Sequence, residues 1–493
     1  MYLKLLAFYT LQLKHLGVTN SSAENIILNT LSGLMSNLEM GNKQFYQTLI
    51  NLKSMILESI DIYKKICKEK NIKPKEIKTD IKLSKRLNIT DLIQLGEKEF
   101  NKKLKLMPDI KRNLYEILFL ILKSICINLV ELKSYGQENK CAYSEILYLL
   151  NTINYPELSE RILIKKIKKG VDIDYMLLKI LYKTRKQNFG EQTETKVSYT
   201  TYPNKAILVA GTNIQELKKV LDATKDKGID VYTHGDMILA YTYPKFREYR
   251  HLKGQFGKGI ENCLLDFATF PGAILVAKHS LENIEYLYRG RLFTTDNFVP
   301  QGVIQIKNDD YTPLINSALN ARGFKTGKTR EDLTIGCNES KIQNIINELA
   351  KNIDRYKNII ILATEEFTSE QKKYYDSLSK HLDENSFIIS LSENHSIENF
   401  VQIHALSDPY MIYRLLEKII SIRDAQKTKI TIFLAKCNKH TVSNIINFKH
   451  LGVDNVFLSK CTPIMLNPTL TNTLKKIFDI YPTTNAAEDI KTL

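Results

Sequence analysis

Hydrophobic residues recur every three to four positions through the first 190 residues of the chain, which is the spacing of amphipathic helices. One such stripe comprises Leu3, Leu6, Tyr9, Leu13 and Leu16. Another runs through "FYQTLINLKSMILESIDIYKKI", and prolines are rare throughout this part. The N-terminal "LLAFYTLQL" fits the helical pattern better than a secretory signal, because no small-residue cleavage site follows it closely. We therefore predict an all-helical, bundle-like domain over residues 1–195.

The pattern changes after a polar stretch, "KQNFGEQTETKVSYTTYPN" (186–204), which we interpret as a linker. From there on, short apolar runs and helical segments form three strand–helix–strand units. Their strands are "KAILVAG" (205–211) with "IDVYTHGD" (229–236), "NIIILATEE" (358–366) with "SFIISLSEN" (386–394), and "KITIFLAKCN" (429–438) with "VDNVFLSKC" (453–461). Such units build parallel sheets with right-handed crossovers. The sequence thus predicts a multidomain α and α/β protein, with two Rossmann-like α/β domains over residues 196–330 and 331–493.

The composition is that of a globular protein, with 43% hydrophobic and 25% charged residues. The longest apolar stretch, residues 117–130, is interrupted by Lys123 and falls short of the ~20 residues that a membrane-spanning helix needs. The seven cysteines are scattered and include no C-x-x-C pair. This usage is typical of a reducing compartment, so we expect a cytoplasmic protein with free thiols and no membrane segment.

Positive charge is concentrated in the helical part of the chain. Residues 1–190 contain 32 Lys and Arg against 19 Asp and Glu, and the chain as a whole carries a net charge of +16. A basic half invites a nucleic-acid or anionic partner. The alternative is a solvated helical surface, since no aromatic residues alternate with the lysines of "KKICKEKNIKPKEIK". We expect an unidentified protein partner or an anionic surface to bind the helical domain, without sequence-specific binding of nucleic acid.

Polar side chains follow the ends of the predicted strands, where ligands of open parallel sheets bind. These loops contain Thr212, His234, Asp236, Glu365, Glu393 and residues 437–440. In the "THGD" turn, His234 and Asp236 could hold a metal or move a proton. They could equally be turn chemistry, with Gly235 at an unusual backbone angle and Asp236 capping a helix.

The glycines of "LKGQFGKGIEN" raise the question of a nucleotide-binding loop. Gly254, Gly257 and Gly259 have the wrong spacing for a dinucleotide fingerprint, and no buried strand is predicted before them. We interpret this stretch as a loop with specialised backbone angles.

Several stretches together resemble the hybrid-cluster proteins, which are hydroxylamine-reductase-like relatives of nickel carbon monoxide dehydrogenases. These stretches are "DVYTHGDMILA", "YPKFREYRHLKGQFG", "FPGAILV", "RLFTTD" and "LGVDNVFLSKCTPIMLNPTL". The resemblance covers nearly the whole chain and is most specific over residues 205–305 and 450–470. It implies a helical domain followed by two α/β domains, with a hybrid iron–sulfur–oxygen cluster held at the loops named above.

The resemblance also implies that nearly every ligand of the cluster is replaced in this chain. The family's histidine ligand corresponds to Thr212, its first glutamate to Asp236, and its cysteines to Ser280, Glu365, Glu393 and a position near Leu406. In the last loop, Asn438 and His440 stand where the family has a glutamate ligand and a lysine. We also expect that the family's second cluster, held by four cysteines near the N-terminus, has no counterpart. The vestigial positions are thus Thr212, Asp236, Ser280, Glu365, Glu393, Asn438 and His440.

None of these positions supplies a thiolate, whereas iron in such clusters is held chiefly by thiolate sulfur. We therefore expect no catalytic residue, no metal and no cofactor here. The favoured interpretation is a cluster-free pseudoenzyme that acts as a binding or structural subunit. His234 is then a turn histidine, because the family keeps a histidine there without binding iron through it.

Two alternatives remain open. The first is an oxidoreductase that reduces hydroxylamine or a related nitrogen oxide at an unconventional metal site, or with an iron–sulfur cluster after all. Asp236, Glu365, Glu393 and His440 would suit a harder ion or zinc, and a cation would offset the mutual rise of the carboxyl pKa values. The second is a hydrolytic enzyme using Ser280 beside His279, although adjacent strand residues point to opposite faces.

Overall fold

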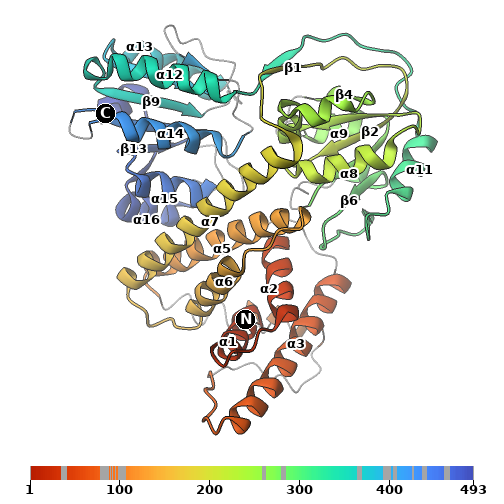
Figure 1. Cartoon of the computed structure of the whole chain (residues 1–493), viewed down its shortest axis with the longest axis vertical. Coiled ribbons are helices and arrows are strands. Elements are labelled where there is room, and N and C mark those ends of the chain that lie inside the picture. The colour runs from red at the N-terminus through yellow and green to blue at the C-terminus, as the bar shows by residue number, and fades with distance from the viewer. Residues whose placement is uncertain are drawn as a thin grey trace. The chain divides into compact units, whose positions relative to one another are not determined.

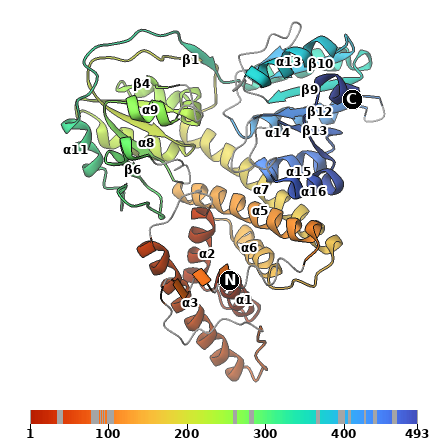
Figure 2. The same ribbon diagram turned by 180° about the vertical axis from the view of Figure 1, so that it is seen from behind.

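The structure is a computed structural model that describes residues 2–34, 42–77, 88, 90–91, 93–94, 96–97, 107–257, 263–278, 285–363, 369–391, 401–403, 408–424, 427–435, 441–459 and 467–491. Figures 1 and 2 show the chain from opposite sides. It divides into two compact units, Met1–Leu177 with Asn297–Gln301, and Leu178–Asp296 with Gly302–Leu493. The domain boundaries near residues 195 and 330 stay predictions.

The first unit is helical, and none of its described residues forms a strand. Its helices are α1 (Tyr2–His15), α2 (Ser21–Gly33), α3 (Asn42–Glu69), α5 (Asp109–Ser134), α6 (Lys140–Thr152) and the first part of α7 (Glu160–Phe189). Helix α1 packs against α2, α3 and α6, and α5 packs against α2 and α6. Leu6 and Leu13 of the predicted stripe are fully buried. The prediction of an all-helical N-terminal region is confirmed.

The second unit contains two parallel sheets of six strands each. The first sheet has the order β4 (Leu252–Gln255), β3 (Ile229–His234), β2 (Lys205–Ala210), β5 (Ala273–Val276), β6 (Leu292–Thr294) and β7 (Ile304–Gln305). The second has the order β11 (Val401–Gln402), β10 (Ser386–Ser390), β9 (Asn358–Ala363), β12 (Lys429–Leu434), β13 (Asn455–Leu458) and β14 (Ile480–Pro482). Numbered within each sheet, both orders are 3-2-1-4-5-6, the doubly wound arrangement of dinucleotide-binding folds. The predicted Rossmann-like architecture is confirmed.

Helices connect the strands of both sheets. Those associated with the first sheet are α8 (Ile214–Thr224), the 3₁₀ helices η1 (Gly235–Thr242) and η2 (Pro244–Glu248), α9 (Cys263–Thr269), α10 (Tyr286–Arg289) and α11 (Thr312–Asn320). Those associated with the second are α12 (Glu339–Lys351), η4 (Ile353–Arg355), α13 (Ser369–His381), α14 (Met411–Ile422), α15 (Thr441–Leu451), α16 (Pro468–Phe478) and α17 (Ala486–Lys491).

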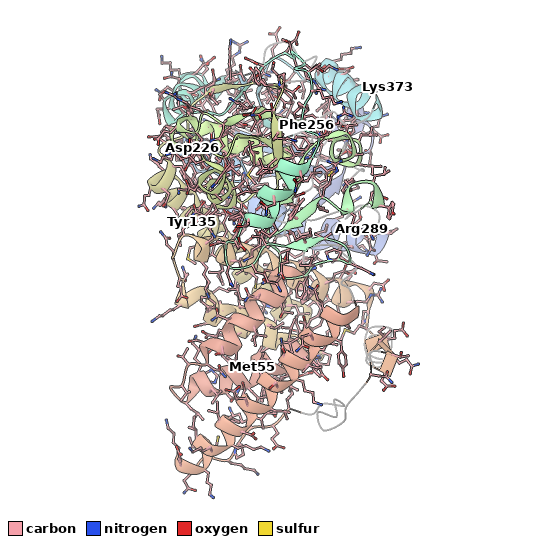
Figure 3. The ribbon with its side chains drawn as sticks, turned by 90° about the vertical axis from the view of Figure 1, so that its right-hand side faces the viewer. Met55, Tyr135, Asp226, Phe256, Arg289 and Lys373 are labelled. Carbon is pink, nitrogen blue, oxygen red and sulfur yellow. The ribbon has the colours of Figure 1, made fainter. Side chains whose placement is uncertain are left out.

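Each sheet has an apolar core of its own. In the second sheet, Ile360 and Leu362 lie on one face of β9 because side chains alternate along a strand, and Tyr375 of α13 and Ala486 of α17 cover that face. In the first, Phe256, labelled in Figure 3, follows β4 and packs against Phe270 and Phe324. The near-continuous apolar runs of the sequence are therefore the buried strands of parallel sheets.

A short antiparallel ladder closes the segment that contains the first sheet. Strand β1 (Thr195–Val197) pairs with β8 (Leu333–Ile335), and isolated bridges join Thr201 to Lys328 and Asn204 to Phe324. We call this ladder, residues 195–204 against 324–335, the clasp. Val197 and Ile335 of the clasp pack with Ile238 of η1.

Two sequence-based interpretations differ from the structure. The polar stretch 186–204 is not a plain linker, because α7 extends through Phe189 and the clasp begins at Thr195. Gly254 does not lie in a loop but in strand β4, where a Cβ atom would overlap the backbone carbonyl of Ser198. The glycine is needed because Ser198 approaches β4 so closely that Gln255 N donates to its carbonyl at 2.8 Å.

No helix in the described part of the chain is both long and apolar enough to cross a bilayer. Cys67, Cys126 and Cys337 are buried free thiols, whereas the free thiol of Cys141 is exposed. Burial raises the pKa of the Cys337 thiol to about 11, so this thiol stays protonated near neutral pH.

Candidate functional site

The strand order of the first sheet reverses between β2 and β5, which is where doubly wound sheets bind their ligands. Ala210, the last residue of β2, pairs in register with His234 on one side and with Val276 on the other. Thr212 and Asp236 each lie two residues beyond the Ala210–His234 pair. The structure therefore brings these two predicted positions to the same edge of the sheet, on adjacent loops.

Thr212 is exposed, and the residue after it begins a helix. Asn213 is buried and caps α8, since its side chain accepts a hydrogen bond from Gln215 N at 3.0 Å. This capping satisfies one of the amide groups left unpaired at a helix N-terminus. The loop after β2 is thus built around the cap of α8, and Thr212 in it is exposed.

His234 ends β3 and is almost completely buried. Its Nε2 donates a hydrogen bond to Oδ2 of Asp266 on α9 at 3.0 Å, and its ring packs edge-on against Phe267, with 5.1 Å between the centroids. Gly235 follows with a φ of +59°, a left-handed backbone angle that favours glycine. These contacts support the interpretation of His234 as a satisfied turn histidine, which stays a prediction.

Asp236 lies in the first turn of η1 and is half-buried. The residue at the cap position of η1 is His234, which makes no capping hydrogen bond through its side chain. The interpretation of Asp236 as a helix cap is therefore wrong, because the 3₁₀ helix already begins at Gly235. Asp236 remains the one described position that keeps the type of ligand expected from the resemblance, a carboxylate.

Hydrogen bonds within the protein occupy the polar groups beside these loops. The Thr233 hydroxyl donates to Gln255 Oε1 at 2.5 Å, and Gln255 Nε2 donates to the Gly235 carbonyl at 3.0 Å. Nearby, the buried hydroxyl of Tyr241 on η1 lies 3.5 Å from the Thr233 hydroxyl, and desolvation raises the Tyr241 pKa far above its usual value. This network fixes the start of η1 against β3 and β4.

A second network of hydrogen bonds joins the ends of β5 and β6 at the same edge of the sheet. The Thr294 hydroxyl, at the end of β6, donates to the Val276 carbonyl at 3.0 Å and accepts from Asp296 N at 3.0 Å. The Thr295 hydroxyl accepts from Lys278 N at 3.0 Å, next to the end of β5. Asp296 is fully buried. Threonine hydroxyls thus replace backbone partners where the strands stop.

The other predicted site positions are Ser280, Glu365, Glu393, Asn438 and His440, and they lie outside the described residues, as do His279 and Leu406. The proposed convergence of Asp236, Glu365, Glu393 and His440 on a metal therefore stays a prediction. Within the described ranges, no three or more His, Cys, Asp or Glu side chains are grouped so that they could hold a metal ion.

The sequence analysis missed a buried polar junction in the second unit. Arg414 of α14 is 5% exposed, donates to Glu339 Oε2 at 2.9 Å and to Gln192 Oε1 at 3.3 Å, and stacks over the ring of Tyr182. Gln192 in turn donates to the Tyr243 hydroxyl at 3.0 Å. We call these five residues the Arg414 junction. Its signal in the sequence is an arginine within the apolar stripe of "MIYRLLEKIISI", since arginine is rarely buried unless it is paired.

The comparisons with known proteins agree with the fold. Residues 21–392 match the family model of the Prismane/CO dehydrogenase family. A hydroxylamine reductase of Thermodesulfovibrio yellowstonii is 24% identical over 459 residues, which cover 89% of this chain and 84% of the relative. Proteins of the same name from Kosmotoga olearia (24% identity, 74% of this chain, 72% of the relative) and Methanocella arvoryzae (23%, 73% and 69%) are also similar.

The resemblance in the sequence, the two doubly wound sheets and the family match lead to the same assignment. The match spans the helical unit from α2 onwards, the whole first sheet and the first two strands of the second sheet. The chain therefore belongs to the Prismane/CO dehydrogenase family.

Proposed function

We propose that this protein is a family member that no longer holds the hybrid cluster, a pseudoenzyme that acts as a binding or structural subunit. The observation that carries the proposal is the set of donor atoms. The aligned positions are Thr212, Asp236, Ser280, Glu365, Glu393, Asn438 and His440. None is a cysteine, and thiolates are what hold iron in such clusters. These residues do not fit an iron–sulfur cluster.

The described edge of the first sheet supports the proposal. The position of the histidine ligand is an exposed threonine hydroxyl, which stays protonated at neutral pH and is a weak ligand for iron. The neighbouring imidazole of His234 is committed to Asp266. Thr233 and Thr294 are hydrogen-bonded to groups of the protein itself.

A second candidate is a reductase of hydroxylamine or a related nitrogen compound that uses another metal. The name hydroxylamine reductase, which all three relatives carry, favours it. So does Asp236, because carboxylates suit harder cations or zinc, and Glu365, Glu393 and His440 offer further oxygen and nitrogen donors. There, manganese or another redox-active metal would bind the substrate nitrogen and take part in electron transfer, whereas zinc would bind it only as a Lewis acid.

Metal analysis separates the two candidates. The protein is produced with iron and sulfide under anaerobic conditions, and its iron, zinc and manganese contents and its hydroxylamine reduction are measured beside an Asp236→Asn variant. The first proposal expects colourless protein without stoichiometric iron and without turnover in either variant. Stoichiometric zinc or manganese that is lost in Asp236→Asn together with turnover supports the second candidate. A brown, iron-rich and active protein overturns the first proposal.

We also propose a cytoplasmic location. The support is that Cys67, Cys126, Cys141, Cys263 and Cys337 are free, which is typical of a reducing compartment. Alkylation of intact cells followed by mass spectrometry tests it, because the exposed thiol of Cys141 should be found reduced.

A further inference from the structure

Four cations form a row on the solvent side of the first turns of α7, the helix drawn in yellow in Figure 1. They are Arg161, Lys165, Lys168 and Lys169, which we call the basic row. The residues of the row are spaced four, three and one positions apart, so they lie on one side of the helix. The side chains of all four are exposed.

Packing on the opposite side fixes the direction in which this row faces. Leu163 and Ile167 are fully buried. At Gly170, a Cβ atom would lie 2.9 Å from Ile121 Cγ2 of α5, so the two helices are in close contact there. Because α7 cannot rotate without breaking this contact, the basic row is held in solvent.

The charges of the row are not neutralised by the described part of the protein. No ion pair to Arg161, Lys165 or Lys168 occurs among the described residues. Lys169 lies 3.9 Å from Glu145 Oε1, with 55% of its side chain exposed, and an exposed pair at that distance is worth little. The exposed carboxylates on this helix, Glu160 and Asp172, stand at the two ends of the row, and its third carboxylate, Asp174, is buried and hydrogen-bonded to Ser124 and Asn128.

The composition of the row distinguishes between kinds of anionic partner. Protein–protein interfaces are depleted in lysine and centred on buried aromatic or apolar side chains. Here three of the four cations are lysines, and the exposed hydrophobic residue beside them is Ile162, which is 41% exposed. A lysine-rich face without an apolar centre is instead typical of contacts with phosphate groups, which lysine binds as a point charge.

The length of the row is compatible with this partner. At about 1.5 Å rise per residue, Arg161 to Lys169 span roughly 12 Å. A strand of duplex DNA carries one phosphate per about 3.4 Å of axis, so about three phosphates fit along the row. We infer that the basic row binds the phosphate backbone of a nucleic acid without reading its bases. This inference names a partner for the proposed binding subunit, and it therefore rests on that proposal.

The test measures fluorescence anisotropy of a labelled DNA duplex of arbitrary sequence with the full-length protein. Wild type is expected to bind in the range of about 10⁻⁴ to 10⁻⁶ M, with a steep loss between about 50 and about 200 mM salt. The variant Arg161→Gln/Lys165→Gln/Lys168→Gln/Lys169→Gln is expected to bind at least about tenfold more weakly and to have a salt slope reduced by about 2 or more. Glutamine keeps helix propensity, and circular dichroism checks the fold of the variant.

A matched control removes the same charge elsewhere. Lys225, Lys227, Lys325 and Arg330 are exposed and have no ion pair among the described residues, so their fourfold glutamine variant is expected to bind as wild type does. Equal losses in both variants, or no binding by wild type, would overturn the inference. Displacement of the duplex by polyglutamate at the same charge concentration would point to an acidic protein instead.

The outcome is separate from that of the metal analysis. A protein that lacks iron and does not bind the duplex keeps the cluster-free proposal and refutes the basic row. A protein that holds iron and binds the duplex through the basic row refutes the cluster-free proposal and supports the inference about the row.

Discussion

The two sheets of the second unit share one strand order but differ at their carboxyl ends. In the first sheet, buried polar groups gather there, namely Thr233, His234, Thr294 and Asp296, and they bond to one another's strands and loops. In the second sheet, the buried polar groups described at the strand ends include Ser390, which ends β10, and Ser459, which follows β13 and accepts a hydrogen bond from Gln371 Nε2 at 3.2 Å. None of the residues of the Arg414 junction belongs to a strand of this sheet.

The difference shows that topology and chemistry are specified separately. Apolar runs separated by helices are enough to produce the 3-2-1-4-5-6 order twice. The polar groups at the ends of the strands are specified residue by residue. Under the proposal of a lost cluster, the fold is kept by the apolar pattern while the residues at the strand ends differ.

The largest effect is expected at the Arg414 junction. Arg414→Met removes a buried cation and its hydrogen bonds to Gln192 and to Glu339, whose side chain is 48% exposed. Losing these two hydrogen bonds of a charged group is expected to cost about 3 kcal/mol of the free energy of unfolding. Lys418 reaches the same carboxylate, with 2.9 Å from its Nζ to Glu339 Oε1, but is itself 31% exposed. Lys418→Met is therefore expected to cost less than about 1 kcal/mol in the same urea titration. Equal losses would show that burial of the arginine does not matter.

A smaller effect is expected beside His234. Gly257 has a φ of +82°, and a Cβ atom there would overlap the Asp266 carboxylate that holds His234. Gly257→Ala should cost about 2 kcal/mol through backbone strain and displacement of Asp266. Gly290 has a helical φ of −68° with open space around it, so Gly290→Ala should be neutral or stabilise slightly. Thermal unfolding compares the two; a tolerated Gly257→Ala would mean that the loop adapts.

A matched pair of threonines tests the two sheets directly. Thr294→Val leaves the Val276 carbonyl and the Asp296 amide without their shared hydroxyl, in a fully buried place, at a cost of about 1–2 kcal/mol. Thr431→Val, in β12, removes only an acceptor for the half-buried Asn455 amide at 3.2 Å. Its cost should be below about 0.5 kcal/mol, because that amide can turn to water. If both cost the same in denaturant titrations, the polar edge of the first sheet has no special role.

The smallest effect is a dependence on pH. Burial alone would raise the pKa of Glu339, but hydrogen bonds from Arg414 and Lys418 lower it below its usual value. A carboxyl with a lowered pKa in the folded state stabilises the fold above its unfolded pKa and loses that contribution as pH falls through the folded value. The stability gap between wild type and Arg414→Met should therefore shrink from about pH 5 to about pH 3. A constant gap would mean that the stacking on Tyr182, and not the charge, holds the junction.

The apolar periodicity was sufficient to predict the helical region, the two parallel sheets and the strands of all three strand–helix–strand units. It failed where tertiary contacts decide the structure. Nothing in "TETKV" (193–197) indicates that it pairs with residues near position 335, because the pairing depends on a partner more than a hundred residues away. Gly254 looked like a loop residue because its reason, the close approach of Ser198, is visible only in three dimensions.

The candidate site was likewise predicted only in part from the sequence. The sequence identified Thr212 and Asp236 as neighbours at one sheet edge, since register follows from parallel pairing. It did not identify Asp266 as the partner of His234, because α9 approaches β3 from another part of the chain. The Arg414 junction was missed because Gln192, Glu339 and Arg414 are far apart in the sequence. Gln192 lies in a polar stretch, and an ordinary helical pattern surrounds Arg414.

The clasp has a consequence for how this chain could be rearranged. Because Thr195 and Ile335 are paired in one ladder, the two ends of the segment between them lie next to each other. Segments whose ends lie together are the ones that tolerate circular permutation and transfer into another protein. The stretch from Thr195 to Ile335, apart from Asn297–Gln301, which belong to the first unit, is therefore a natural cassette, and its own ends would serve as the junction for exchanging the first sheet between relatives.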